Sequence, residues 1–68
     1  MNETLRNQLL EDKPKGFTMF GGTMRYYMWK VDCLMFEWKE TINEMIVSNE
    51  ISRTGNYDVS GDVLDICK

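Results

Sequence analysis

Histidine is absent from this 68-residue chain, and cysteine and proline are scarce, with two cysteines and one proline. Without histidine the commonest general base of enzymes is missing, and neither Cys33 nor Cys67 has the histidine partner of a thiol nucleophile. Two cysteines also supply only half of a tetrahedral zinc site. We therefore expect no enzymatic activity, no metal site and no cofactor.

Signals for secretion or membrane insertion are also missing from the sequence. Secreted domains that depend on disulfides usually carry four or more cysteines. No apolar stretch of signal-peptide type opens the chain, and its longest apolar runs, such as residues 33–36, are too short for a membrane span. Alanine is absent while Met, Asn, Ile and Glu are plentiful, which suggests an AT-rich gene of a phage or mobile element. We expect a reduced cytoplasmic protein, in the host cytoplasm if a phage encodes it.

Length and composition predict one compact domain over residues 1–68. The chain is 43% hydrophobic and 28% charged, which is ordinary for a globular domain. A core of this size supplies only about 3–5 kcal/mol of stability, and domains so small usually gain support from disulfides, a metal or another chain. Because the first two are disfavoured here, we expect association with another protein or with a second copy, as a homodimer.

The first half of the chain predicts a helix followed by an antiparallel β-hairpin. Asn2 is suited to cap a helix, and Pro14 should end that helix near Asp12. The runs Phe17–Phe20 and Thr23–Val31 are rich in aromatic residues and are separated by two glycines, which is a hairpin signal.

The second half predicts a longer amphipathic helix, from Asp32 to about Glu50, and a short extended C-terminal segment. Its expected core-facing stripe comprises Leu34, Met35, Trp38, Ile42, Met45 and Ile46. A capping box at residues 41–44 allows a later start with residues 33–38 as a strand, but the apolar spacing continues across Thr41. Residues 57–59 could pair with the hairpin or with residues 63–66, or the final segment could be a helical turn. The predicted fold class is α+β.

Seven of the eight aromatic residues lie between positions 17 and 38. If residues 24–31 form a strand, Arg25, Tyr27 and Trp29 share one face. The first helix and the tail could cover that face, or it could be an interface, where Tyr, Trp and Arg are enriched. We therefore expect these three residues to contact a protein partner.

The glutamates Glu37, Glu40 and Glu44 lie opposite the apolar stripe of the long helix. Such a ladder is most often a solvated face, but it also suits a basic partner. Together these features predict a small non-enzymatic protein-binding module, an accessory or inhibitor protein of the phage type that acts on a larger host protein.

Two other functions remain open. In a DNA- or RNA-binding accessory protein, Tyr27 and Trp29 would stack on bases while Arg25 and Lys30 bind phosphates. In an acidic mimic of nucleic acid, the glutamate face would be the binding surface. The net charge of −3, with the basic residues scattered along the chain, disfavours nucleic-acid binding.

Overall fold

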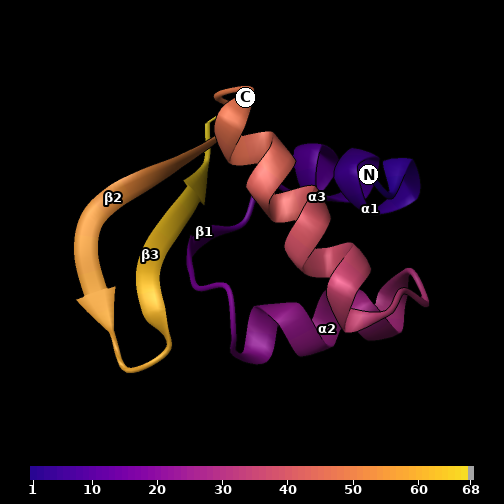
Figure 1. The fold of residues 1–68 in the computed structure, drawn as a ribbon, viewed down its shortest axis with the longest axis horizontal. Helices are drawn as coiled ribbons and strands as arrows, with labels where there is room; N and C mark the ends of the chain where they lie inside the picture. Colours follow the sequence, from indigo (N-terminus) through magenta and orange to yellow (C-terminus); the bar gives the residue numbers. More distant parts are fainter. Residues whose placement is uncertain (68) are drawn as a thin grey trace.

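The computed structural model describes residues 1–67 and confirms the α+β class (Figure 1). Within these residues three helices and three strands follow one another as α1 (Glu3–Asp12), β1 (Lys15–Phe17), α2 (Gly22–Lys30), α3 (Met35–Val47), β2 (Ile51–Asp58) and β3 (Gly61–Ile66). The N-terminal helix, an antiparallel hairpin and a longer helix are all present. The hairpin, however, lies in residues 51–66, in the segment expected to be only a short extended tail.

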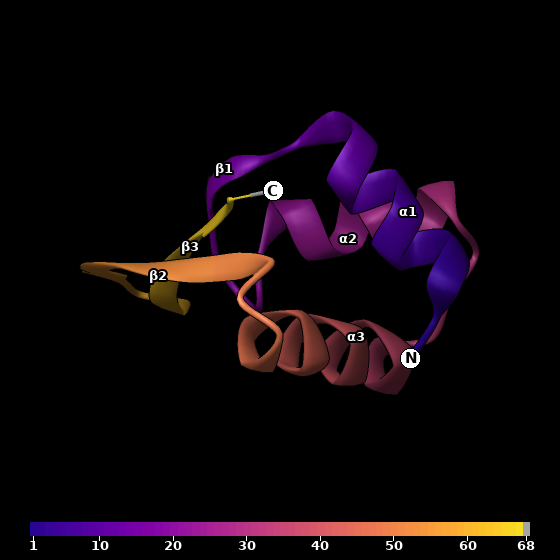
Figure 2. The same cartoon turned by 90° about the horizontal axis from the view of Figure 1, so that it is seen from above.

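The three strands form an antiparallel sheet in the order β1-β3-β2. Strands β2 and β3 pair from Ile51 opposite Ile66 to Asp58 opposite Gly61. Figures 1 and 2 show this hairpin extending away from the three helices, with its turn at the far end. Helix α3 contacts α1, α2 and β2, so it is the element that joins the helices to the sheet.

Residues 23–31 were expected as the second strand of a hairpin, but residues 22–30 form helix α2 instead. Met24 and Tyr27 are its buried residues, and their spacing of three places them on one face of a helix but on opposite faces of a strand. Gly21 is extended, with φ of 173°, and Gly22 is already helical, so the two glycines form no hairpin turn. Aromatic and Thr side chains favour strands only weakly, and here packing against the core decides the conformation.

Helix α3 is shorter at both ends than expected, and residues 35–38 are helical, which excludes the alternative start at Thr41. Asp32 has a positive φ of 52° in the turn after α2. Leu34 is extended, and its N–H donates to Oε1 of Glu37 at 2.9 Å, which fixes the first turn of α3. At the other end Asn49, with φ of 64°, turns the chain toward β2.

Helix α1 agrees with the prediction at both ends. The Asn2 side chain accepts a 3.0 Å hydrogen bond from the N–H of Leu5, which caps the helix. After Asp12, Lys13 adopts a left-handed conformation with φ of 51°, and Pro14 follows. Both signals are local to the chain, so the sequence alone locates this helix.

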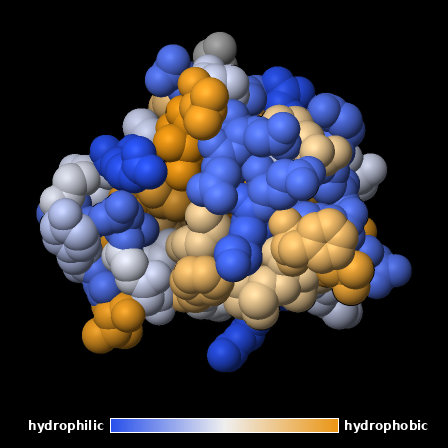
Figure 3. All heavy atoms as spheres, in the orientation of Figure 1, coloured by the Kyte–Doolittle hydropathy of each residue, from blue (hydrophilic) through white to orange (hydrophobic). Residues whose placement is uncertain are grey.

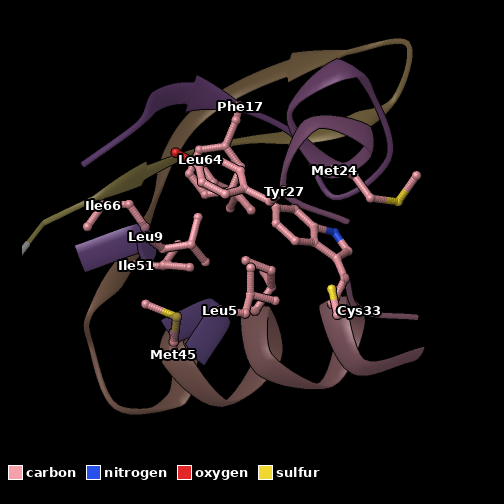
Figure 4. Packing of buried hydrophobic residues seen from close by; sticks show 12 residues of the cluster. Leu5, Leu9, Phe17, Met24, Tyr27, Cys33, Met45, Ile51, Leu64 and Ile66 are labelled. Carbon is pink, nitrogen blue, oxygen red and sulfur yellow. The ribbon is translucent and has the colours of Figure 1, made fainter. Parts of the chain in front are cut away.

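The core is centred on Trp38, which is fully buried. Its indole N–H donates to the carbonyl of Met19 at 2.8 Å, and the rings of Phe17 and Tyr27 each lie 6.3 Å from its ring centroid. Figure 4 shows buried side chains from the helices and the sheet meeting in one cluster, including Leu5, Leu9, Phe17, Met24, Tyr27, Cys33, Met45, Ile51, Leu64 and Ile66.

A buried carboxylate joins α1 to the corner between α3 and β2. Glu50 accepts hydrogen bonds from the guanidinium of Arg6, with Nε at 3.2 Å from Oε2, and from the Ser48 hydroxyl at 2.7 Å. Glu50 is almost completely buried, and Ile51 directly after it belongs to the core. This corner therefore orients β2 relative to the helices.

Candidate protein-interaction surface

Helix α2 has one buried face and one exposed face. Tyr27 lies on the buried face with Met24, whereas Arg25 and Trp29, four residues apart, lie together on the exposed face. Trp29 is 78% exposed, an unusually large fraction for a tryptophan. Arg25 and Trp29, both expected as contact residues, are thus exposed, although they lie on a helix rather than a strand.

Tyr27 was wrongly expected among the contact residues. It is only 4% exposed, and its ring stacks on that of Trp38 with an interplanar angle of 13°. Its hydroxyl donates to Oδ2 of Asp12 at 2.8 Å. Burial raises the pKa of the Tyr27 phenol well above its usual value, and the Asp12 carboxylate raises it further. Tyr27 is therefore part of the core, because a helix turns position 27 away from positions 25 and 29.

Tyr26, unlike Tyr27, lies on the exposed face of α2. Its ring lies 6.2 Å from that of Trp29, and the ammonium group of Lys30 lies 5.5 Å above it. Lys30 also pairs with Asp12 at 3.3 Å, and that hydrogen bond raises the Lys30 pKa. The face of α2 thus combines two aromatic rings with the cations of Arg25 and Lys30.

A second group of exposed apolar side chains lies at the start of α3. Leu34 is 62% exposed, Phe36 is 63% exposed, and Met35 is nearly half exposed. Leu34 and Met35 were wrongly expected in the core stripe of the helix predicted from Asp32. In the structure Leu34 is the extended residue before α3, so its side chain does not follow the helical spacing of Trp38 and Ile42.

Both groups lie within eleven consecutive residues, 26–36, and we call them the α2–α3 surface (Tyr26, Trp29, Leu34, Met35 and Phe36). Figure 3 shows apolar side chains at the lower right of the molecule, where Figure 1 places the start of α3. Nearby on α3, the ammonium of Lys39 lies 5.6 Å above the ring of Phe20, which is itself half exposed.

The three glutamates of α3 have contacts within the chain. Glu37 accepts from the N–H of Leu34 and, at 3.5 Å, from the Asn2 side chain. Glu40 and Glu44 lie 2.6 and 3.3 Å from the ammonium group of Met1. The acidic ladder is therefore partly neutralised and partly used to cap α3, although Glu40 and Glu44 are exposed.

The elements follow one another as helix, strand, two helices joined by a short turn, and β-hairpin. The exposed residues of α3 include Glu40, Glu44 and Phe36. This arrangement describes the fold and does not by itself define a function.

Comparisons of the chain with protein-family models, with curated proteins and with solved structures gave no match. Across residues 1–67, none of the helices has the length and apolar character needed to cross a membrane. The same residues contain no cluster of three His, Cys, Asp or Glu side chains that could hold a metal ion. Cys33 is a buried thiol whose pKa is raised by burial, and Cys67 is an exposed thiol.

Proposed function

We propose that the protein is a non-enzymatic binding module that docks on a larger protein through the α2–α3 surface. The observation that supports this proposal is the exposure of Trp29, Leu34 and Phe36, at 78, 62 and 63%, within eleven consecutive residues that also include the exposed Tyr26 and Met35. Tryptophan and other aromatic residues are frequent at the centres of protein interfaces.

The size of the surface is consistent with the centre of an interface. A covered aromatic side chain buries about 150–250 Å². Given their exposed fractions, Tyr26, Trp29 and Phe36 with Leu34 and Met35 offer on the order of 500 Å² of apolar area. Stable interfaces bury roughly 800 Å² on each partner, of which the centre is apolar and the rim polar.

Charge indicates the kind of partner. Arg25 and Lys30 flank the aromatic rings of α2, so a partner with an apolar patch and acidic residues around it would complement the surface. A second copy docked about a two-fold axis through α2 would bring the same cations toward each other. This favours a different protein over the homodimer, and such a module would act as an accessory or inhibitor of its partner.

Nucleic-acid binding receives less support. Arg6, Lys30 and Arg53 each form an ion pair with a carboxylate of the same chain. Tyr27, one of the two rings expected to stack on bases, is buried. Phosphate binding depends on cations that are free to release counterions, and these pairs reduce their number.

Partner capture with matched variants tests the proposal. Wild-type protein, Trp29→Ala, Phe36→Ala and the control Val59→Ala, which changes the exposed tip of the hairpin, would be used as bait in host extract. A protein retained by wild type and Val59→Ala but lost with both α2–α3 variants would then be purified for calorimetry. We expect each of the two variants to weaken binding by about 2 kcal/mol or more.

Three outcomes would overturn the proposal. Equal capture of the same host protein by wild type, Trp29→Ala and Phe36→Ala would remove the α2–α3 surface from the interface. Sedimentation of the protein alone as a dimer that Trp29→Ala converts to monomer would assign the same surface to a second copy. Salt-sensitive binding of single-stranded DNA or RNA, lost with Trp29→Ala, would favour the nucleic-acid alternative.

A further inference from the structure

A hollow of about 330 Å³ lies between the C-terminal end of α3 and the beginning of β2. Its lining residues are Ile46, Asn49, Ile51, Ser52, Arg53 and Cys67. In Figure 3 apolar side chains are visible between the hairpin at the left and α3 at the centre, in the region where these elements meet. The hollow is separate from the α2–α3 surface, since the two share no residue.

The lining residues divide into an apolar floor and a polar rim. Ile51 is buried and Ile46 is partly buried against the core, so their side chains form the floor. The exposed residues Asn49, Ser52 and Arg53 supply an amide, a hydroxyl and a guanidinium, all of which can donate hydrogen bonds. Ligand pockets combine these two features and typically measure about 300–1,000 Å³, so this one suits a ligand about the size of one amino-acid residue.

Backbone contacts hold the wall of the hollow in place. The Cys67 thiol donates to the carbonyl of Asn49 at 3.0 Å, and the Cys67 N–H donates to the carbonyl of Glu50 at 2.9 Å. The positive φ of Asn49 turns the chain sharply between α3 and β2. Because these contacts tie the end of β3 to the α3–β2 corner, the hollow is formed before any ligand arrives.

Arg53 is the cation of the hollow. Its Nε lies 3.4 Å from Oδ2 of Asp62, and the two side chains are 60% and 44% exposed. Such an exposed pair contributes little to stability, so a ligand carboxylate has little to displace at the guanidinium. A guanidinium has further N–H donors at its two terminal nitrogens, which match the two oxygens of a carboxylate.

A second, smaller hollow of about 160 Å³ adjoins the first. It shares Ile46 and Arg53 with the first and is also lined by Met19, Phe20, Leu64 and Asp62, among others. A ligand held by its carboxylate at Arg53 can therefore reach apolar side chains of both hollows. This favours a peptide C-terminus over a small carboxylic acid.

We propose that the hollow binds an apolar carboxylate, with its aliphatic body against Ile46 and Ile51 and its two oxygens on the guanidinium of Arg53. The shared chemistry is that of a small branched carboxylic acid or of a peptide ending in an aliphatic residue. Ser52 and Asn49 orient the carboxylate from the rim. The proposal does not depend on the α2–α3 surface.

Nuclear magnetic resonance titration of the ¹⁵N-labelled full chain tests this proposal with defined probes. The probes are acetyl-Leu-Leu with a free carboxylate, the same peptide with a C-terminal amide, and 4-methylpentanoic acid. We expect the peptide with the free carboxylate to shift the backbone N–H signals of residues 49–53, with saturation in the millimolar range. The peptide with the C-terminal amide should bind at least tenfold more weakly. A peptide that binds at least tenfold more tightly than 4-methylpentanoic acid identifies a peptide C-terminus, and similar affinities identify a small acid.

Variants assign the effect to the hollow. Arg53→Gln should weaken the free acid peptide at least tenfold, whereas Asp62→Asn should bind it severalfold more tightly because the competing carboxylate is gone. Lys15→Gln, the same charge change on β1, should leave affinity unchanged. Equal shifts with the acid and the amide, or signals that respond elsewhere in the chain, would overturn the proposal. Wild-type affinity of Arg53→Gln for the free acid peptide would also overturn the proposal. If Arg53→Gln does not fold, the proposal is overturned when Asp62→Asn binds the peptide no more tightly than wild type.

Discussion

The hydroxyl of Tyr27 donates a 2.8 Å hydrogen bond to Oδ2 of Asp12, which connects the middle of α2 to the last residue of α1. The same bond holds the Asp12 pKa below its usual range, and the ammonium group of Lys30 lies 3.3 Å from the same oxygen. Tyr27 therefore links the buried face of α2 to α1, while Trp29 lies on the opposite, exposed face.

Tyr27→Phe should lower the free energy of unfolding by about 1 kcal/mol, the usual contribution of one hydrogen bond. The phenylalanine ring retains the stacking on Trp38, so the packing volume is almost unchanged. Urea denaturation followed by circular dichroism measures the difference. Tyr57→Phe, at an exposed position of β2, is the control and should match wild type. Equal stability of all three proteins would show that the Tyr27–Asp12 bond makes no net contribution.

Stability should fall at both extremes of pH because of the same pair. The Asp12 pKa is depressed in the folded state. The carboxylate therefore contributes fully to the free energy of unfolding above the ordinary pKa of 3.8, and this contribution is lost as pH falls through the lower pKa of the folded state. The Tyr27 pKa is raised, so its contribution is complete below the ordinary value of 10.0 and is lost as pH rises above it. Tyr27→Phe should flatten both changes. Parallel profiles of the two proteins would contradict the assignment.

Substitution of Gly22 tests whether residues 22–30 are a helix, and Gly61, which has a positive φ, is the comparison. An added Cβ at Gly22 meets no atom within 4 Å, and a helical glycine costs backbone entropy, so Gly22→Ala should stabilise the protein by about 0.5 kcal/mol. Gly61, the first residue of β3, has a φ of +111°, so Gly61→Ala should destabilise by about 1 kcal/mol or more. Chemical denaturation measures both. Destabilisation by Gly22→Ala would instead indicate a turn with positive φ at that position.

Replacement by alanine should lower the free energy of unfolding far more at Trp38 than at Trp29. Trp38→Ala removes a fully buried ring and the hydrogen bond to Met19, and truncations of this kind cost about 3–5 kcal/mol, comparable to the whole stability of so small a domain. Trp29→Ala should change the free energy of unfolding by no more than about 0.5 kcal/mol. Circular dichroism of both variants gives the result. An unfolded Trp29→Ala would mean that this residue belongs to the core.

Local signals explain which elements could be predicted from the sequence. Asn2 and Pro14 act on the backbone next to them, so the ends of α1 did not depend on the remainder of the fold. Residues 24–31 carry aromatic and apolar side chains at both strand and helix spacing, and only packing against Trp38 selects the helix. Cross-strand pairing of β2 with β3 likewise depends on residues distant from the individual segment.

The candidate surface could be predicted only in part for the same reason. Arg25 and Trp29 lie on one face in either a strand or a helix, because their spacing of four residues is twice the strand repeat of about 2 and close to the helical repeat of about 3.6. Tyr27, halfway between them, faces the same way in a strand and the opposite way in a helix. Leu34 was wrongly expected in the core because it is the extended residue before α3, and the carboxylate of Glu37 sets where that helix begins. Phe36 lies opposite the core stripe at helical spacing, two residues before Trp38, so its exposure follows from the helix itself.

Trp38 lies in the interior while Trp29 lies almost entirely in water, so the chain contains two optical reporters with separate environments. Emission from the interior ring should be blue-shifted and shielded from acrylamide, and emission from the outer ring should be red-shifted and readily quenched. Unfolding would shift the first component toward the second. A partner that covers the outer face of α2 would protect the second component and leave the first unchanged, so that folding and docking are separable in one fluorescence spectrum without any added label.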